Sequence, residues 1–211
     1  MDDDNHKFTR NVTLNITMTE MLEKIEHKLI DSAIRVVKDG EGCLYVIQLS
    51  GLDYESLIKN DFEKFSIFEE VHQKRLDILA KTDGACIINN EGELVGYGAK
   101  INNTQAFEGY GTRHAAAFSA SLIGNIAILG SQENKKIRIF KEGKLVMQID
   151  TLEKGIEQET GKAVNLLESV GIGALSTLGA GLLFPAVAVA ILPGILIFGS
   201  THFIIKSIFK K

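Results

Sequence analysis

The sequence predicts an α/β fold with one central mixed β-sheet flanked by helices, followed by a long hydrophobic segment. Strand-like and helix-like stretches alternate along residues 19–150, which is typical of a sheet covered by helices. The stretch Cys43–Leu49 is almost continuously apolar, as expected of a strand in a covered sheet. Residues 169–205 contain no Asp, Glu, Lys or Arg, so a separate, lipid-like environment is predicted for them.

The first half of the chain predicts two helical regions with a strand between them. Thr17-Met18-Thr19-Glu20 is typical of a capping box, and apolar residues follow it at helical spacing until Asp39-Gly40 ends the helix. Residues 1–18 are expected to be an N-terminal tail with a frayed start. A loop or short helix is expected over residues 53–60, and residues 62–79 are expected to be mostly helical.

The second half predicts a β-hairpin, a helix and three more strands. Cys86–Ile88 and Leu94–Tyr97 are joined by a turn containing Asn, Glu and Gly, which suits a hairpin. A polar loop at residues 102–105 follows, which either covers a ligand or simply faces solvent. A helix is predicted over residues 114–123, and strands over 125–129, 136–140 and 144–149.

Charge and cysteine content exclude some classes of protein. The net charge of −4 argues against a general nucleic-acid binder, which usually carries a basic surface. Cys43 and Cys86 lie in apolar runs without metal-type spacing, so both are expected to be reduced and buried. His72 has no acidic or thiol partner at metal-ligand spacing, and an ordinary, partly exposed histidine is the expectation.

Two short motifs carry groups suited to phosphate chemistry. Asp83-Gly84-Ala85 places a carboxylate at the head of the hairpin, where it can hold a divalent metal or take a proton from a hydroxyl. Gly111-Thr112-Arg113-His114 leads into an alanine-rich helix, so backbone N–H groups and a guanidinium can meet an anion there. Each motif taken alone is also an ordinary turn sequence, but together they favour nucleotide polyphosphate chemistry.

The pair of motifs resembles the signature of the diadenylate cyclase domain, the family that makes cyclic di-AMP from ATP. Residues 79–82 before Asp83 and residues 127–133, which include Ser131 and Glu133, also resemble that family. The resemblance covers residues 19–150. The family usually has an arginine directly after the Arg-His pair, whereas this chain has Ala115.

The resemblance implies a reaction in which two ATP molecules form cyclic di-AMP and two pyrophosphates between two facing protomers. It implies Asp83 as the catalytic residue, Mg²⁺ or Mn²⁺ as the cofactor, and a homo-oligomer with face-to-face sites. The implied metal ligands are Asp83, His114 and Glu133. The implied nucleotide-binding residues are Gly84, Ala85, Ile101, Gly111, Thr112, Arg113, His114, Ala115, Ala116 and Ser131.

The C-terminal part predicts a membrane attachment. Residues 151–168 are polar and helix-prone and are expected to connect the domain to residues 169–211. A bilayer crossing needs about 20 apolar residues, and the uncharged stretch spans 169–205, so a transmembrane helical hairpin bent near Pro185 or Pro193 is predicted. A single tilted span over residues 182–205 is the competing arrangement. The catalytic domain would then lie at the cell membrane on its cytoplasmic side, where ATP is found.

Two other functions remain open on the sequence. One is a nucleotide-binding sensor or membrane effector that keeps the fold and has lost turnover, with Ala115 as its mark. The other is a pore-forming or membrane-disrupting tail gated by the domain. Retention of Asp83 favours the cyclase, because a site that only binds a nucleotide has no need of a carboxylate that activates a hydroxyl.

Overall fold

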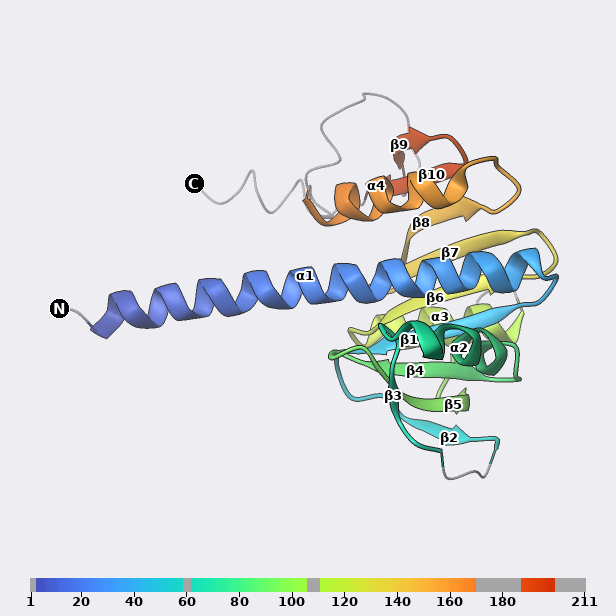
Figure 1. Cartoon of the computed structure of the whole chain (residues 1–211), viewed down its shortest axis with the longest axis horizontal. Helices are drawn as coiled ribbons and strands as arrows, with labels where there is room; N and C mark the ends of the chain where they lie inside the picture. Colours follow the sequence, from blue (N-terminus) through green and yellow to red (C-terminus); the bar gives the residue numbers. More distant parts are fainter. Residues whose placement is uncertain (1–2, 59–61, 106–110, 170–186, 200–211) are drawn as a thin grey trace.

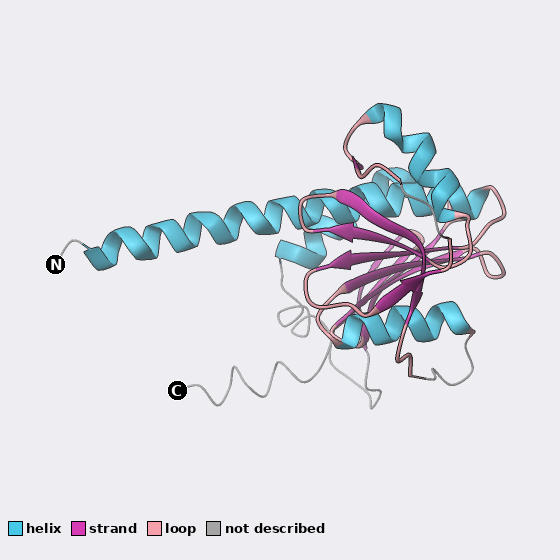
Figure 2. Ribbon diagram, turned by 90° about the horizontal axis from the view of Figure 1, so that it is seen from below, coloured by secondary structure: helices cyan, strands magenta, loops and turns pink. Residues whose placement is uncertain are grey.

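The computed structural model describes residues 3–58, 62–105, 111–169 and 187–199, which form one mixed β-sheet with helices on both faces (Figures 1 and 2). The sheet has ten strands in the order β2-β5-β4-β1-β6-β7-β8-β10-β9, and β3 pairs with β5 beside this path. Only β1 and β4 run parallel among the described pairs; the others are antiparallel. The central mixed sheet flanked by helices is therefore as predicted.

The bounds of the described elements are as follows. The helices are α1 (Asp3–Lys38), the 3-10 turn η1 (Glu70–His72), α2 (Gln73–Ala80), α3 (Thr112–Leu122) and α4 (Ile156–Ser169). The strands are β1 (Cys43–Gln48), β2 (Tyr54–Ser56), β3 (Phe65–Ser66), β4 (Ala85–Asn89), β5 (Glu93–Ile101), β6 (Ile126–Ser131), β7 (Lys136–Lys141), β8 (Lys144–Asp150), β9 (Val187–Leu192) and β10 (Ile195–Gly199).

Side chains of each central strand alternate between two hydrophobic cores. On β1, Tyr45 and Ile47 belong to the larger core, which α1, α2 and α4 cover, whereas Leu44 and Val46 face the core under α3. The alternation follows from the two-residue repeat of a strand. Both faces of β1 are buried, which explains why its sequence is apolar at every position from Cys43 to Ile47.

The two cysteines are free and buried, as the sequence predicts. Cys43 lies on β1 and Cys86 on the neighbouring β4. Burial raises the pKa of the Cys43 thiol to about 12, and burial also raises the pKa of Cys86. Both thiols therefore stay protonated and serve as small apolar core groups.

Helix α1 begins earlier than the sequence predicts. It starts at Asp3, so the tail expected over residues 1–18 is helical from that residue, and the helix extends well beyond the sheet (Figure 1). No glycine or proline interrupts residues 3–38, so the capping box at Thr17 does not force a start. The end agrees with the prediction, because Gly40 takes a φ of 89° and its N–H bonds the carbonyl of Val37.

Two further segments differ from the prediction. The loop or short helix expected over residues 53–60 contains the edge strand β2, which pairs with the end of β5. The helix expected over residues 62–79 is reduced to α2, with β3 and η1 before it. Phe65 on β3 is buried and lies under the guanidinium of Arg75, so it contributes to the core from a strand.

The C-terminal apolar segment departs most from the prediction. The helical hairpin expected within residues 169–205 is wrong over residues 187–199, which form the β-hairpin β9–β10 and continue the sheet beyond β8. Ile195 and Ile197 are buried in the larger core, and the Gly194 carbonyl accepts a bond from the N–H of Asp150. Residues 170–186 and 200–211 lie outside the described part. Among the described helices, none is long and apolar enough to cross a bilayer.

Candidate active site

Two adjoining cavities lie at one end of the central strands. The larger, of about 450 Å³, is bordered by the start of α3 and the turn between β6 and β7. The smaller, of about 290 Å³, is bordered by β5, the start of α3 and the residues around Leu57. Asp83, Thr112 and Arg113 line both cavities, so these three residues mark their common edge.

Asp83 stands immediately before β4 with its side chain 90% exposed. Its Oδ1 atom accepts a hydrogen bond of 3.0 Å from the N–H of Gly84. Gly84 has a φ of 95°, and a Cβ there would lie 2.6 Å from the carbonyl carbon of Gly98. Only glycine fits, because both the backbone angle and the close approach of β5 exclude a side chain. The Asp-Gly pair therefore aims the carboxylate outward.

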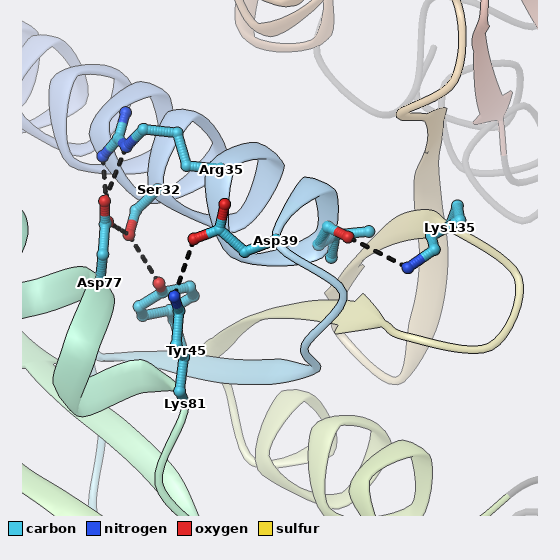
Figure 3. A network of polar contacts seen from close by, with 8 residues as sticks. Ser32, Arg35, Asp39, Tyr45, Asp77, Lys81 and Lys135 are labelled. Carbon is cyan, nitrogen blue, oxygen red and sulfur yellow. Dashed lines mark hydrogen bonds and ion pairs between the residues drawn. The ribbon is translucent and has the colours of Figure 1, made fainter.

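The segment that leads to Asp83 is tied to helix α1 (Figure 3). Asp77 on α2 accepts hydrogen bonds from Arg35, at 2.8 and 3.1 Å, and from Ser32. Ser32 also shares a hydrogen bond of 2.7 Å with the buried hydroxyl of Tyr45. At the end of α2, Lys81 donates to Asp39 at 2.7 Å. This network fixes α2 against α1 and so fixes where the chain enters β4.

Helix α3 presents its N-terminal end to both cavities. Gly111 is the N-cap, and its carbonyl accepts bonds from the N–H groups of His114 and Ala115. The N–H groups of the first turn of a helix lack partners within that helix, and the helix dipole adds partial positive charge there. Arg113 adds a guanidinium whose Nη2 atom lies 3.8 Å from Oδ1 of Asp83. Together these groups suit an anion such as a phosphate.

His114, in the first turn of α3, is held by an arginine of strand β7. Its Nε2 atom lies 3.1 Å from Nη1 of Arg138 on β7, and Nε of Arg138 donates to Gln148 at 3.2 Å. A guanidinium has donors only, so Nε2 accepts and the ring proton is on Nδ1. The pKa of His114 is lowered, first by burial and then by Arg138, while Glu133 acts against this shift. The imidazole is therefore neutral at physiological pH.

The turn between β6 and β7 supplies the far wall of the larger cavity. Ser131 ends β6, and Glu133 follows two residues later. Lys135 then takes a φ of 53° and donates to the carbonyl of Val37 at 3.3 Å (Figure 3). The turn is thus anchored to the C-terminal end of α1, the same end that holds Lys81.

Residues 31–145 match the family model described as DisA bacterial checkpoint controller nucleotide-binding, the DAC domain. This match covers more than half of the 211 residues. The chain belongs to the diadenylate cyclase family. The resemblance drawn from Asp83-Gly84-Ala85 and from Gly111-Thr112-Arg113-His114 is confirmed.

The relatives define how far the similarity extends. The diadenylate cyclase of Methanocaldococcus jannaschii is 31% identical in an alignment 156 residues long, which covers 64% of this chain and 50% of that protein. The chain therefore spans half the length of this curated relative. Among solved structures, DacA from Staphylococcus aureus has a TM-score of 0.45 and 17% identity, with 73% of this chain and 97% of that one covered. A hypothetical membrane spanning protein from Bacillus cereus has a TM-score of 0.41 and 15% identity, with coverages of 68% and 98%.

The structure brings most of the predicted site residues of this family member together. The larger cavity is lined by Asp83, Gly111, Thr112, Arg113, His114, Ser131 and Glu133. The smaller cavity is lined by Asp83, Gly84, Ile101, Thr112, Arg113 and Ala116. Ala85 lines neither cavity because its side chain is buried beneath α3, and Ala115 also lines neither.

Other lining residues were missed by sequence reasoning. Gln132 and Asn134 belong to the β6–β7 turn, and Leu57, Lys100 and Thr104 border the smaller cavity. Thr104 falls in the polar loop for which covering a ligand was one of two interpretations. Arg138 had no signal in the sequence, since an arginine within a strand is ordinary until the sheet register places it beside His114.

The predicted metal ligands do not form a ready-made metal centre. Within the described residues, no three His, Cys, Asp or Glu side chains are grouped as a metal ion requires. Asp83 and Glu133 both line the larger cavity, and Mg²⁺ is often held by one or two carboxylates together with substrate phosphates. These two carboxylates fit a metal that arrives with a triphosphate. His114 can join them through Nε2 only by giving up its contact with Arg138.

Proposed function

We propose that this chain is a diadenylate cyclase that converts two ATP molecules into cyclic di-AMP and two pyrophosphates. The observation that carries the proposal is the position of Asp83 and Arg113, 3.8 Å apart at the common edge of two cavities. One cavity is suited to a nucleoside and the other to phosphates. The sugar that joins these two parts of ATP would then lie beside the Asp83 carboxylate.

The smaller cavity has the features of a nucleoside pocket. Leu44, Ile101 and Ala116 give it apolar walls, and Thr104 adds a hydroxyl. The larger cavity has the first turn of α3, Arg113 and Ser131, which can donate hydrogen bonds to phosphate oxygens. Family membership supports the binding of a nucleotide by this domain.

In the proposed reaction, each Asp83 carboxylate takes the proton from the ribose 3′-hydroxyl of its ATP. The 3′-oxygen forms a bond to the α-phosphorus of the ATP on a facing protomer, and the bond from that phosphorus to the bridging oxygen of pyrophosphate breaks. Two such attacks close the ring. Arg113 and the N–H groups of Gly111 and Thr112 stabilise the negative charge that develops on the phosphates.

Asp83 and Glu133 would hold Mg²⁺ or Mn²⁺ together with the triphosphate. When bound, such an ion supplies positive charge that polarises the α-phosphate and offsets the charge of the leaving pyrophosphate. Among the described residues that line the larger cavity, Arg113 carries the positive charge, because His114 is neutral. A divalent ion therefore complements the charges that this chain itself provides.

The reaction requires two protomers, because each nucleotide attacks the other. The Asp83 side chain is 90% exposed, which supports a position at which the hydroxyl beside it can meet the α-phosphate brought by a second protomer. We therefore propose a homodimer with face-to-face cavities, and an isolated protomer is expected to be inactive.

Membrane attachment is a further part of the proposal. The uncharged residues 170–186 and 200–205 are the candidates for contact with a bilayer, because residues 187–199 belong to the sheet. Since ATP is cytosolic, the domain is proposed to face the cytoplasm. Flotation of the full chain with phosphatidylglycerol vesicles tests the attachment. Protein that stays in the dense bottom fraction while the vesicles float would contradict it.

A nucleotide-binding sensor that lacks turnover is the second candidate, favoured by Ala115 where the family usually has arginine. Incubation of the full chain with ATP and Mn²⁺, followed by mass spectrometry of the products, separates the two. Cyclic di-AMP with pyrophosphate supports the cyclase. ATP that binds and is recovered unchanged overturns the cyclase and supports the sensor.

A further inference from the structure

Gly42 lies in the connection between α1 and β1, outside both family motifs. Its backbone does not require glycine, since it is not among the residues with positive φ, whereas Gly40 in the same connection has a φ of 89°. Gly40 therefore makes the turn, and any residue could adopt the conformation of Gly42. The glycine at position 42 is therefore explained by the atoms that surround it and not by its backbone angles.

The neighbour is the guanidinium of Arg113. A Cβ at position 42 would lie 2.5 Å from Nη1 of Arg113 and 3.3 Å from the carbonyl oxygen of Gly130. The first distance is far below van der Waals contact. The guanidinium thus rests directly against the Gly42 backbone with Nη1, while Nη2 of the same group lies 3.8 Å from Asp83.

We infer that Gly42 is a positioning residue for Arg113: the missing side chain leaves the space in which the guanidinium lies between the two cavities. The inference rests on the proposed function in that Arg113 is taken to bind a nucleotide phosphate. Gly42 lines neither cavity, so it acts chiefly through the position of Arg113.

A side chain at position 42 displaces chiefly a flexible group and requires only a small shift of the Gly130 carbonyl. The clashing atom is the far end of an arginine that is 37% exposed, so it can turn away at little cost in stability. The loss falls on phosphate binding, since a displaced guanidinium no longer presents both terminal nitrogens to the oxygens. Loss of one charge-assisted contact of this kind corresponds to about a tenfold to hundredfold loss of affinity.

The test is a double-mutant cycle on the full chain, made of Gly42→Ala, Arg113→Ala and their combination. Binding of ATP and of adenosine is measured by calorimetry. Gly42→Ala is expected to weaken ATP binding about tenfold and to leave adenosine binding unchanged, and it is expected to have no further effect in the Arg113→Ala background. Gly51→Ala is the matched control, because nothing lies within 4 Å of a Cβ at that position and its φ is not positive.

Spectra of ¹⁵N-arginine-labelled protein without nucleotide add a readout that does not depend on catalysis. The Nε–H signal of Arg113, assigned from its loss in Arg113→Ala, is expected to move in Gly42→Ala and to stay in Gly51→Ala. An unmoved signal, or an equal loss of ATP affinity with and without Arg113, overturns the inference. If the wild-type chain binds ATP without making cyclic di-AMP, the cyclase proposal is refuted and the binding test of Gly42 still applies. If the chain binds no ATP, the inference about Gly42 is tested by the Arg113 signal alone.

Discussion

The Nη2 atom of Arg113 lies 3.8 Å from Oδ1 of Asp83, so two sequence motifs 30 positions apart meet at one edge. The distance is that of an ion pair and is too long for a direct hydrogen bond. The carboxylate keeps its exposed oxygens available, and the guanidinium keeps donors available for an anion. A carboxylate and a guanidinium thus stand side by side, the combination that the proposed transfer to a ribose hydroxyl requires.

The first prediction concerns Asp83→Asn. An amide of the same shape cannot take a proton, so cyclic di-AMP formation is expected to fall by at least about 10²-fold, the lower end for loss of a general base. In the absence of a divalent metal, ATP is expected to bind as before or more tightly, because a negative charge is removed beside the phosphates. Mass spectrometry of the products and calorimetry of binding measure the two effects. Glu41→Gln, which removes an exposed carboxylate outside both cavities, is the control. Undiminished product from Asp83→Asn would refute the role of this residue.

The second prediction concerns stability at acid pH. The folded-state pKa of His114 is lowered below its ordinary value of 6.5, first by burial and then by Arg138. The unfolded chain therefore binds a proton more readily, and the free energy of unfolding should fall as pH drops from about 6.5 through the lowered pKa. His114→Gln is expected to remove this part of the decline. Urea denaturation between about pH 5 and pH 7.5 measures it.

His27 provides a control of opposite sign. Its hydrogen bond with Asp31 raises its pKa above 6.5, so its contribution to stability is complete below that pH and is lost as pH rises through the raised value. His27→Gln should therefore lower stability mainly at the acid end of the same series. A parallel response of the two variants to pH would contradict both assignments.

The third prediction concerns the network that holds α2 against α1. Asp77→Asn keeps the shape of the side chain but removes the charge that accepts bonds from Arg35 and Ser32. Because the Asp77 side chain is only 17% exposed, the loss is expected to lower the free energy of unfolding by about 1–3 kcal/mol. Chemical denaturation checks this, with the exposed Glu70→Gln as a control expected to change little. Equal stability of the two variants would mean that hydrophobic contacts alone dock α2.

Much of the fold could be predicted from the sequence, as could many of the residues that line the two cavities. Two apolar runs joined by a turn of Asn, Glu and Gly predicted the β4–β5 hairpin, and Asp83 directly precedes the first run. Contacts set by sheet register were not accessible: Arg138 reaches His114 only because β7 lies beside β6 in the folded sheet. Likewise, the sequence gives no reason for a glycine at position 42, because the reason is the contact with Arg113 in the folded chain.

The C-terminal apolar segment, residues 169–205, was misassigned from the sequence for a different reason. A run of apolar residues does not distinguish a buried strand from a membrane helix by periodicity alone. Residues 187–199 contain β-branched residues and a Pro193-Gly194 pair between two apolar runs, which favours a strand, a turn and a strand. The prediction of a membrane helix followed instead from the length of the uncharged stretch, the 37 residues 169–205. The open edge of β8, which β10 covers, could not be seen in the sequence.

The last prediction tests whether this hairpin belongs to the folded domain. Ile197 on β10 is fully buried and stands opposite Met147 of β8, so Ile197→Ala leaves a cavity in the larger core. Substitutions of this kind lower the free energy of unfolding by about 2–5 kcal/mol. Leu152→Ala removes an apolar side chain that is 73% exposed and should change stability by no more than about 0.5 kcal/mol. Denaturation of both full-length variants, followed by fluorescence and circular dichroism, gives the comparison. If residues 187–199 instead formed a membrane helix, Ile197→Ala would leave unfolding of the nucleotide-binding domain unchanged, and the two variants would be indistinguishable.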